Sequence, residues 1–107
     1  MDYTEAAAGF GLLADPSRLC ILVRLGQKGE QSATELLEAL SITQPTLSHH
    51  MKFLCQGGLV EKRRQGQRVL YRLERAALER LLAVPLAQPA EGQRAASPVI
   101  VRSGHKW

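Results

Sequence analysis

Residues 41–73 read SITQPTLSHHMKFLCQGGLVEKRRQGQRVLYRL, and they decide the fold because they join a short helix to a basic β-hairpin. Thr43 is a typical N-cap, and Pro45 fits the first turn of a helix, where its missing N–H leaves no hydrogen bond unmade. The pair Gly57-Gly58 ends the predicted helix after about three and a half turns. Clear signals at both ends therefore predict a defined helix in this segment.

The predicted helix has one apolar stripe and one polar face. The stripe follows the i, i+3, i+4, i+7 spacing that packs a helix against a core, and it consists of Leu47, His50, Met51 and Leu54. The outward side chains are Gln44, Thr46, Ser48, His49 and Lys52. Hydroxyls and amides of this kind can hydrogen-bond to base edges or phosphates, so the face is predicted to contact DNA. An ordinary amphipathic helix is the alternative interpretation.

A second short helix is predicted immediately upstream. Ser32-Ala33-Thr34-Glu35 forms a capping box, and Leu36, Leu37 and Leu40 supply an apolar face before the helix stops near Ser41. The two helices meet across a turn of about three residues, which is the form of a helix-turn-helix motif. In such motifs the first helix braces the second as it enters the major groove.

The hairpin follows directly, with strands predicted at residues 59–63 and 68–73 around the turn Arg64-Gln65-Gly66-Gln67. Residues 61–75 hold six basic side chains against two acidic ones, a net charge of +4 that equals the formal charge of the whole chain. The basic residues are Lys62, Arg63, Arg64, Arg68, Arg72 and Arg75. This concentration is expected of a wing that neutralises phosphates, although a solvated edge hairpin protected by charge is an alternative.

Further helices are predicted on either side of this motif. Residues 3–13 place Tyr3, Ala6, Ala7, Phe10 and Leu13 on one face. Asp15 and Pro16 open the next helix, which is expected to turn Leu19, Leu22 and Val23 inward before Gly26. Residues 75–84 form the last helix, closed by Pro85.

The expected fold is mainly α with a β-hairpin wing (α+β), in the order α-α-α-α-β-β-α. With 107 residues and 45% hydrophobic content the chain can make one globular domain, and residues 1–84 are predicted to form it. Residues 85–107 are rich in Pro, Ala, Gly and Ser, and we expect a flexible tail.

The composition also argues against several classes of protein. No run of about 18 apolar residues is present to span a membrane, and no signal peptide is recognised, so we expect no membrane partner and a cytoplasmic location. Two cysteines do not make a secreted disulfide framework. No Ser/His/Asp set, phosphate loop or carboxylate pair stands out, so no enzymatic activity is expected.

Several of these motifs together resemble the ArsR/SmtB family of bacterial winged-helix repressors over about residues 5–84. The resemblance is carried by Asp15-Pro16-Ser17-Arg18-Leu19, Ser32 with Glu35-Leu36, residues 43–50 (TQPTLSHH), Gly58-Leu59-Val60 and Gly66 in the wing. It implies a homodimer built through the first and last helices, a second motif helix in the major groove of operator DNA, and release of the DNA by an inducer. The residues that it implies for DNA contact are Gln44, Thr46, Ser48 and His49 at bases or phosphates, Lys52 at the backbone, and Arg64, Gln67 and Arg68 at the flanking minor groove or backbone.

A homodimer is also expected on physical grounds, because a single short domain makes few phosphate contacts, whereas two copies can read two half-sites. The terminal helices carry apolar side chains with little remaining chain to cover them, namely Tyr3, Phe10, Leu78, Leu81 and Leu82. We expect a dimer surface there, although a protomer core claims some of these residues.

The sensing residues depart from those of the family. Residues 32–37 read SATELL, so the Cys-x-Cys found in many relatives is missing, and residues 75–84 contain none of the His or Asp residues that bind zinc in others. The remaining soft ligands are Cys20, Cys55, His49, His50 and His105, which have no compact metal-binding spacing, so any metal site is unknown. Cys20 and Cys55 are candidate sensor thiols for oxidants, reactive sulfur, arsenite or a soft metal, or else small side chains without a role.

The sequence therefore predicts a sequence-specific, homodimeric transcriptional repressor that an inducer releases from double-stranded operator DNA. Two alternatives remain at this point. One is a winged-helix module that binds an acidic protein partner, and the other is a DNA-binding repressor without a ligand site.

Overall fold

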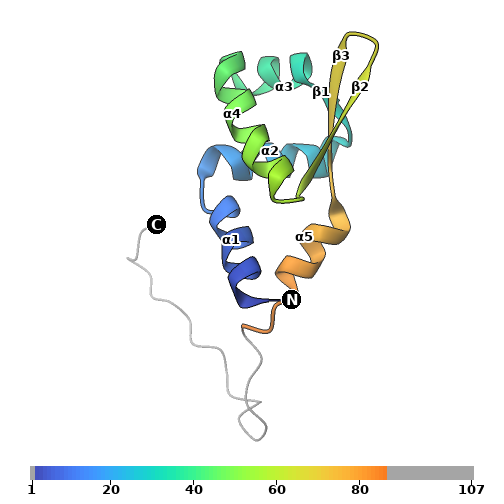
Figure 1. Ribbon diagram of the computed structural model, residues 1–107. Helices are drawn as coiled ribbons and strands as arrows, with labels where there is room; N and C mark the ends of the chain where they lie inside the picture. The colour runs from blue at the N-terminus through green and yellow to red at the C-terminus, as the bar shows by residue number, and fades with distance from the viewer. Residues whose placement is uncertain (1, 87–107) are drawn as a thin grey trace, which may run out of the picture.

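A computed structural model of the protein describes residues 2–86, in which five helices and three strands are arranged as in Figure 1. In chain order the elements are α1 (Tyr3–Leu13), α2 (Pro16–Lys28), β1 (Gln31–Ser32), α3 (Ala33–Leu40), α4 (Gln44–Gln56), β2 (Val60–Gln65), β3 (Arg68–Leu73) and α5 (Arg75–Leu82). The winged helix-turn-helix prediction is confirmed. The predicted tail lies almost wholly outside the described residues, and α5 ends two residues before the predicted Val84.

Helix starts follow the capping signals of the sequence. The Asp15 carboxylate accepts a hydrogen bond from the Arg18 backbone N–H, and the Thr43 hydroxyl accepts one from the Thr46 N–H. At α3 the capping box is complete, because Ser32 and Glu35 each accept a bond from the backbone of the other. Local hydrogen bonding therefore positions α4 and the helix that braces it.

Helix α2 runs past the predicted stop at Gly26 and ends instead before Gly29, which has a φ of 83°. Of the three residues predicted to point inward, Leu22 is buried as expected, but Leu19 and Val23 are 46% and 49% exposed, so the prediction was wrong for these two. Ile21, Leu22 and Leu25 are the α2 residues buried in the core. Helix α2 has apolar side chains on more than one side. The packing of the other elements decides which of these sides is buried.

The sheet has three strands in the order β1-β3-β2, so the predicted element order lacked one strand. In β1, Gln31 pairs with Tyr71 and Ser32 with Leu70, both in antiparallel register. Two residues without β-branched or aromatic side chains give no strand signal in a sequence. The hairpin is also longer than predicted, because β2 extends to Gln65 and leaves two residues in the turn.

The core lies between α2, α3, α4 and the base of the hairpin. Its buried residues are Ile21, Leu22, Leu25, Leu36, Leu47, Met51, Leu54, Leu59, Val60 and Tyr71. All three aliphatic positions predicted for the inner face of α4 belong to this cluster, and the helix is thereby fixed with its opposite face in solvent.

Helices α1 and α5 come from the two ends of the described chain and pack together away from the wing tip (Figure 1). Leu81 is 3% exposed and lies against Gly9, so it belongs to the protomer and not to the predicted dimer surface. Tyr3 and Leu82 are 76% and 61% exposed. The end of the molecule opposite the wing tip therefore keeps an apolar surface.

Within residues 2–86 no single helix has the length and apolar composition needed to cross a membrane. Helices α1 and α2 meet these two criteria only when they are taken together, and a bend of 90° separates them.

Candidate nucleic-acid interface

Helix α4 exposes two lines of side chains on either side of its outer face. Gln44, Ser48 and Lys52 are four residues apart and lie on the flank nearer the wing, and all three are exposed. This side of α4 and the hairpin together form a concave surface.

The other flank of α4 faces the start of α2. His49 packs its ring edge-on against Phe53, with ring centroids 5.0 Å apart, and the Arg18 guanidinium lies 5.8 Å from the centre of the Phe53 ring. Thr46 is exposed at the first turn, where its hydroxyl accepts a hydrogen bond from the Thr43 hydroxyl. The two predicted contact residues Thr46 and His49 therefore do not share the wing-side flank with Gln44, Ser48 and Lys52.

His50 is a packing residue of α4. Its buried Nδ1 atom has no hydrogen-bond partner among residues 2–86 and lies 3.9 Å from Oδ2 of Asp15. The Arg18 backbone N–H holds the pKa of the Asp15 carboxyl below its usual value, with a further contribution from His50. The rings of His49 and His50 are 5.6 Å apart at an angle of 63°, so the pair points in different directions.

The basic residues of the wing divide between its two faces. Arg63 forms two hydrogen bonds with Glu30, at 2.7 and 2.8 Å, and these hold the pKa of the Glu30 carboxyl below its usual value. Arg72 pairs with Glu61 and Glu74. Two of the six basic residues counted in the sequence are thus already neutralised by acids of the same chain.

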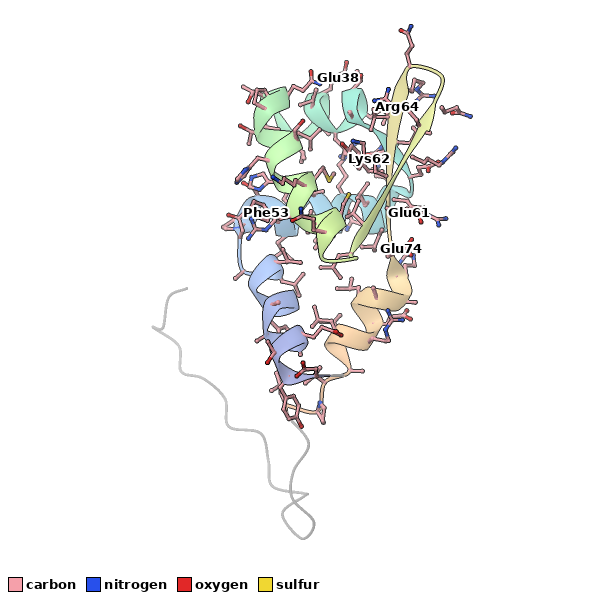
Figure 2. The ribbon with its side chains drawn as sticks, viewed as in Figure 1. Glu38, Phe53, Glu61, Lys62, Arg64 and Glu74 are labelled. Carbon is pink, nitrogen blue, oxygen red and sulfur yellow. The ribbon has the colours of Figure 1, made fainter. Side chains whose placement is uncertain are left out.

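The face of the hairpin toward α4 carries other basic residues of the wing. Lys62 pairs in register with Tyr71, and Arg64 with Val69, so these side chains share the face that includes the buried Tyr71. Within residues 2–86 neither Lys62 nor Arg64 has an acidic partner. Figure 2 shows Lys62 in the space between the hairpin and α4, and Glu61 on the other side of the hairpin.

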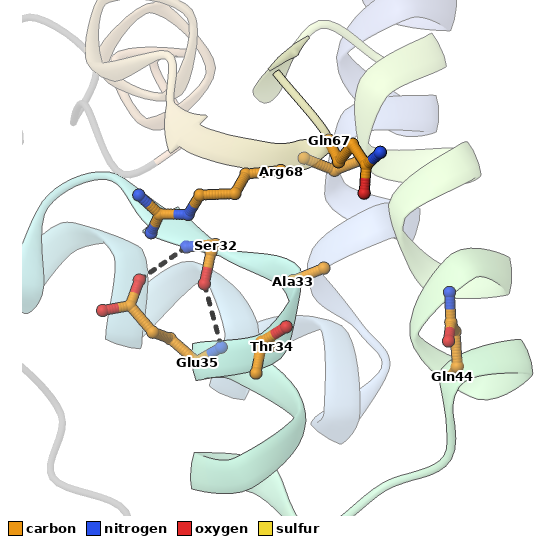
Figure 3. Close-up of a pocket in the computed structure, with 8 residues that line it drawn as sticks. Ser32, Ala33, Thr34, Glu35, Gln44, Gln67 and Arg68 are labelled. Atoms are coloured by element: carbon orange, nitrogen blue, oxygen red, sulfur yellow. Dashed lines mark hydrogen bonds between the residues drawn. The ribbon is translucent and has the colours of Figure 1, made fainter. Parts of the chain in front are cut away.

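A cleft of about 500 Å³ separates the start of α3, the start of α4 and the wing. Gln44 lies on one side of it and Gln67 and Arg68 on the other, as Figure 3 shows. Its floor is the capping box of Ser32 and Glu35. The structure therefore brings three of the predicted contact residues, from two separate elements, around one opening.

The two candidate thiols have different surroundings. Cys20 is exposed on α2, Cys55 is half-buried on α4, and both are free. Burial raises the pKa of the Cys55 thiol, and the nearby Lys62 opposes this rise. A raised pKa reduces the thiolate fraction of Cys55 at neutral pH.

A metal site is not assembled from the described part of the chain. Among residues 2–86, no group of three or more His, Cys, Asp and Glu side chains is placed to hold a metal ion. His105 lies outside these residues.

Comparisons with known proteins agree with this geometry. A model of the family described as bacterial regulatory protein, arsR family, matches residues 15–62. The arsenical resistance operon repressor of Staphylococcus xylosus is 44% identical over 79 residues, which cover 74% of this chain and 75% of the relative. The chain belongs to the ArsR family.

Solved structures place the same family on this fold. An ArsR-like transcriptional regulator from Rhodococcus sp. RHA1 is 34% identical, with a TM-score of 0.68 over 75% of this chain and 74% of that one. The transcriptional repressor BigR from Xylella fastidiosa is 36% identical, with a TM-score of 0.65 over 76% and 83% of the two chains. This ArsR-family protein is a DNA-binding transcriptional repressor regulated by an inducer, and it is not an enzyme.

Sequence reasoning missed two features of this surface. It counted the basic residues of the wing without assigning each one to a face of the hairpin. That assignment requires the register of the two strands, which depends on the residue at which the turn begins. It also did not place Lys62 and Tyr71 together on the face of the hairpin toward α4. Their period-2 relation to Arg64 and Val69 was the available signal.

Proposed function

We propose that this ArsR-family protein acts as a homodimer, with α4 of each protomer in the major groove of an operator half-site and the wing at the flanking minor groove or backbone. The proposed contact residues are Gln44, Thr46, Ser48, His49, Lys52, Arg64, Gln67 and Arg68. The observation that supports this most directly is the convergence of uncompensated wing cations and polar α4 side chains on one concave side. We also propose a cytoplasmic location, as expected of a DNA-binding repressor.

Two substitutions test the assigned DNA face by fluorescence anisotropy on duplex from the protein's own upstream region and on random duplex. Arg64→Ala should weaken binding to both and lower the slope of log affinity against log salt by about one. Gln44→Ala should mainly reduce the preference for the upstream sequence, by about 1–3 kcal/mol if its amide reads an adenine. Lys28→Ala removes the same charge as Arg64→Ala from the exposed end of α2 and serves as the control. Full affinity in both test variants would disprove the assigned face.

Dimerisation through α1 and α5 forms part of the proposal. Tyr3 and Leu82 are exposed apolar residues at the end of the protomer farthest from the wing tip, which suits contact with a second copy. A twofold axis there would present two α4 helices to half-sites about one helical turn, or a multiple of it, apart. Residues 1–84, which contain every element named here, are the proposed DNA-binding and dimerisation domain.

The proposed inducer is a soft, thiol-directed species such as arsenite. Similar proteins from two staphylococci are named as arsenical resistance operon repressors, and Cys20 and Cys55 are thiols available in this chain. Arsenite and a mild oxidant, added to separate samples of the DNA complex, should release the DNA, and a Cys20→Ser/Cys55→Ser variant should resist release. Release that persists in this variant would exclude both thiols. A complex indifferent to both reagents would favour a repressor without a thiol ligand site.

A further inference from the structure

A second cleft, of about 310 Å³, lies between the later turns of α4 and the base of the wing. Its walls include Met51 and Tyr71, which are 2% and 6% exposed, together with the half-buried Cys55. Its polar members include Ser48, Lys52 and Lys62, all of them exposed. The cleft is thus bounded by both elements that the proposed function assigns to DNA.

The polar groups of this cleft form a set that suits a phosphate oxyanion. Lys52 and Lys62 have no acidic partner among residues 2–86. Tyr71 lines the cleft, and no hydrogen bond within the described residues engages its hydroxyl. A tyrosine phenol has an ordinary pKa of about 10 and is a donor at neutral pH, and burial raises the pKa of Tyr71 further. Two ammonium groups and two hydroxyls can therefore donate to one anion.

The position of the cleft identifies the source of that anion. Where a helix occupies the major groove and a wing the adjacent minor groove, the sugar-phosphate strand that separates the grooves crosses the gap between them. In this protein that gap is the second cleft, the one lined by Lys62 and Tyr71. We propose that the cleft holds a DNA backbone phosphate, with Lys62 and Tyr71 as contact residues additional to those on α4 and the wing tip. This inference rests on the proposed function.

The first test compares Lys62→Gln and Tyr71→Phe with the wild-type protein by fluorescence anisotropy over a series of salt concentrations. Lys62→Gln should weaken binding to upstream and random duplex alike, by about three- to tenfold, and lower the salt slope by about one. Tyr71→Phe should weaken both by about two- to fivefold without changing the slope, because it removes a neutral donor. Lys28→Gln is the matched charge control and should change neither quantity. Thermal melts confirm that each variant is folded.

The second test uses Cys55 as a probe within the cleft, in a Cys20→Ser background. Iodoacetamide and iodoacetate both alkylate the thiolate sulfur with loss of iodide, and the thiol proton passes to the buffer. Their adducts are similar in size but differ by one negative charge. Bound duplex should slow the alkylation of Cys55, and the carboxymethyl adduct should weaken DNA binding several-fold more than the neutral carbamidomethyl adduct. Inorganic phosphate at matched ionic strength should not protect Cys55.

The outcomes separate this inference from the proposed function. If the wild-type protein binds duplex while Lys62→Gln and Tyr71→Phe keep its affinity and salt slope, and duplex does not protect Cys55, the phosphate contact is disproved and the DNA-binding proposal stands. Protection by inorganic phosphate but not by duplex would assign the cleft to a small anion instead. A wild-type protein that binds no duplex would overturn both proposals.

Discussion

Glu35 accepts a hydrogen bond from the Ser32 backbone N–H across 2.7 Å, and its own N–H donates to the Ser32 hydroxyl. These contacts with Ser32 hold the pKa of the Glu35 carboxyl below the usual glutamate value, with smaller contributions from Arg68 and Arg24. The capping box is therefore both the start of α3 and the floor of the cleft beside Gln44. One pair of side chains links helix stability to the shape of the interface.

The lowered pKa of Glu35 predicts a pH dependence of stability. A carboxyl with a depressed folded-state pKa stabilises the fold above its unfolded-state pKa of about 4.3, and that contribution is lost as the pH falls through the folded-state value. Urea midpoints of wild-type protein should therefore fall more steeply than those of Glu35→Gln as the pH drops from about 5 to 3. Because Asp15 and Glu30 also have lowered pKa values, the difference between the two proteins isolates Glu35. Parallel curves would contradict the assignment.

Loss of the Ser32 hydroxyl should destabilise the fold by about 1 kcal/mol, the usual cost of removing an N-cap. The measurement is the free energy of urea unfolding of Ser32→Ala. Thr34→Ala, two residues further along α3, is the control, because Thr34 is exposed and does not belong to the capping box. Equal effects of the two substitutions would show that the cap contributes nothing.

Residue types predicted the helix starts well because the capping hydrogen bonds are local. Ser32, Thr43 and Asp15 each satisfy backbone N–H groups within three residues of their own position. Burial was harder to predict. Leu19 and Val23 have the right spacing for a core face, but the core is formed by elements distant in sequence, and their packing selects Ile21 and Leu25 instead.

At the scale of elements, the wing depends on a two-residue turn. Gly66 has a φ of 63°, and Gln65 and Arg68 pair on either side of it. Glycine at the first central position matches the twist of a hairpin, whereas a side chain there costs about 1 kcal/mol or more. The sequence predicted the hairpin from this glycine and placed the turn two residues too wide, since Arg64 and Gln65 carry no signal that distinguishes strand from turn.

Gly66→Ala should therefore destabilise the protein by about 1 kcal/mol and weaken DNA binding by disturbing the wing tip. The matched control is Gly11→Ala near the end of α1, where an added Cβ meets no atom within 4 Å. That change should stabilise the helix by about 0.5–1 kcal/mol. Urea unfolding of both variants checks the opposite signs, and a stabilised Gly66→Ala protein would contradict the turn geometry.

At the scale of the whole molecule, the described chain has one end that we propose faces DNA and an opposite, apolar end. The helix-turn-helix and wing were predictable because their signals are periodic or local. The ion pairs of Arg63 and Arg72 were not, since they depend on the register of β2 against β3 and on the position of Glu30. The net charge of residues 61–75 already subtracts Glu61 and Glu74, so it overstated the charge available to DNA only through the pairing of Arg63 with Glu30.

Two neighbouring leucines of α5, Leu81 and Leu82, differ in solvent exposure and should therefore respond differently to substitution. Leu82→Glu should leave the protomer folded and shift the protein from dimer to monomer, measured by sedimentation velocity, because Leu82 is 61% exposed. Leu81→Ala should instead lower the free energy of unfolding by about 2–5 kcal/mol, because Leu81 is buried against α1. A Leu82→Glu protein that remains dimeric would exclude this part of α5 from the interface.

The short strand β1 has a mechanical consequence for the wing. It supports β3 at Leu70 and Tyr71, and beyond these residues the hairpin is held by its own ladder between β2 and β3 and by the packing of Val69 against the core. The wing is therefore fixed mainly at its base, and we expect its bending motion to increase toward Gly66. Amide hydrogen exchange should be slow near Tyr71 and faster toward the tip. A flexible wing tip on a rigid hairpin base can adapt to DNA grooves of different width while α4 keeps its position.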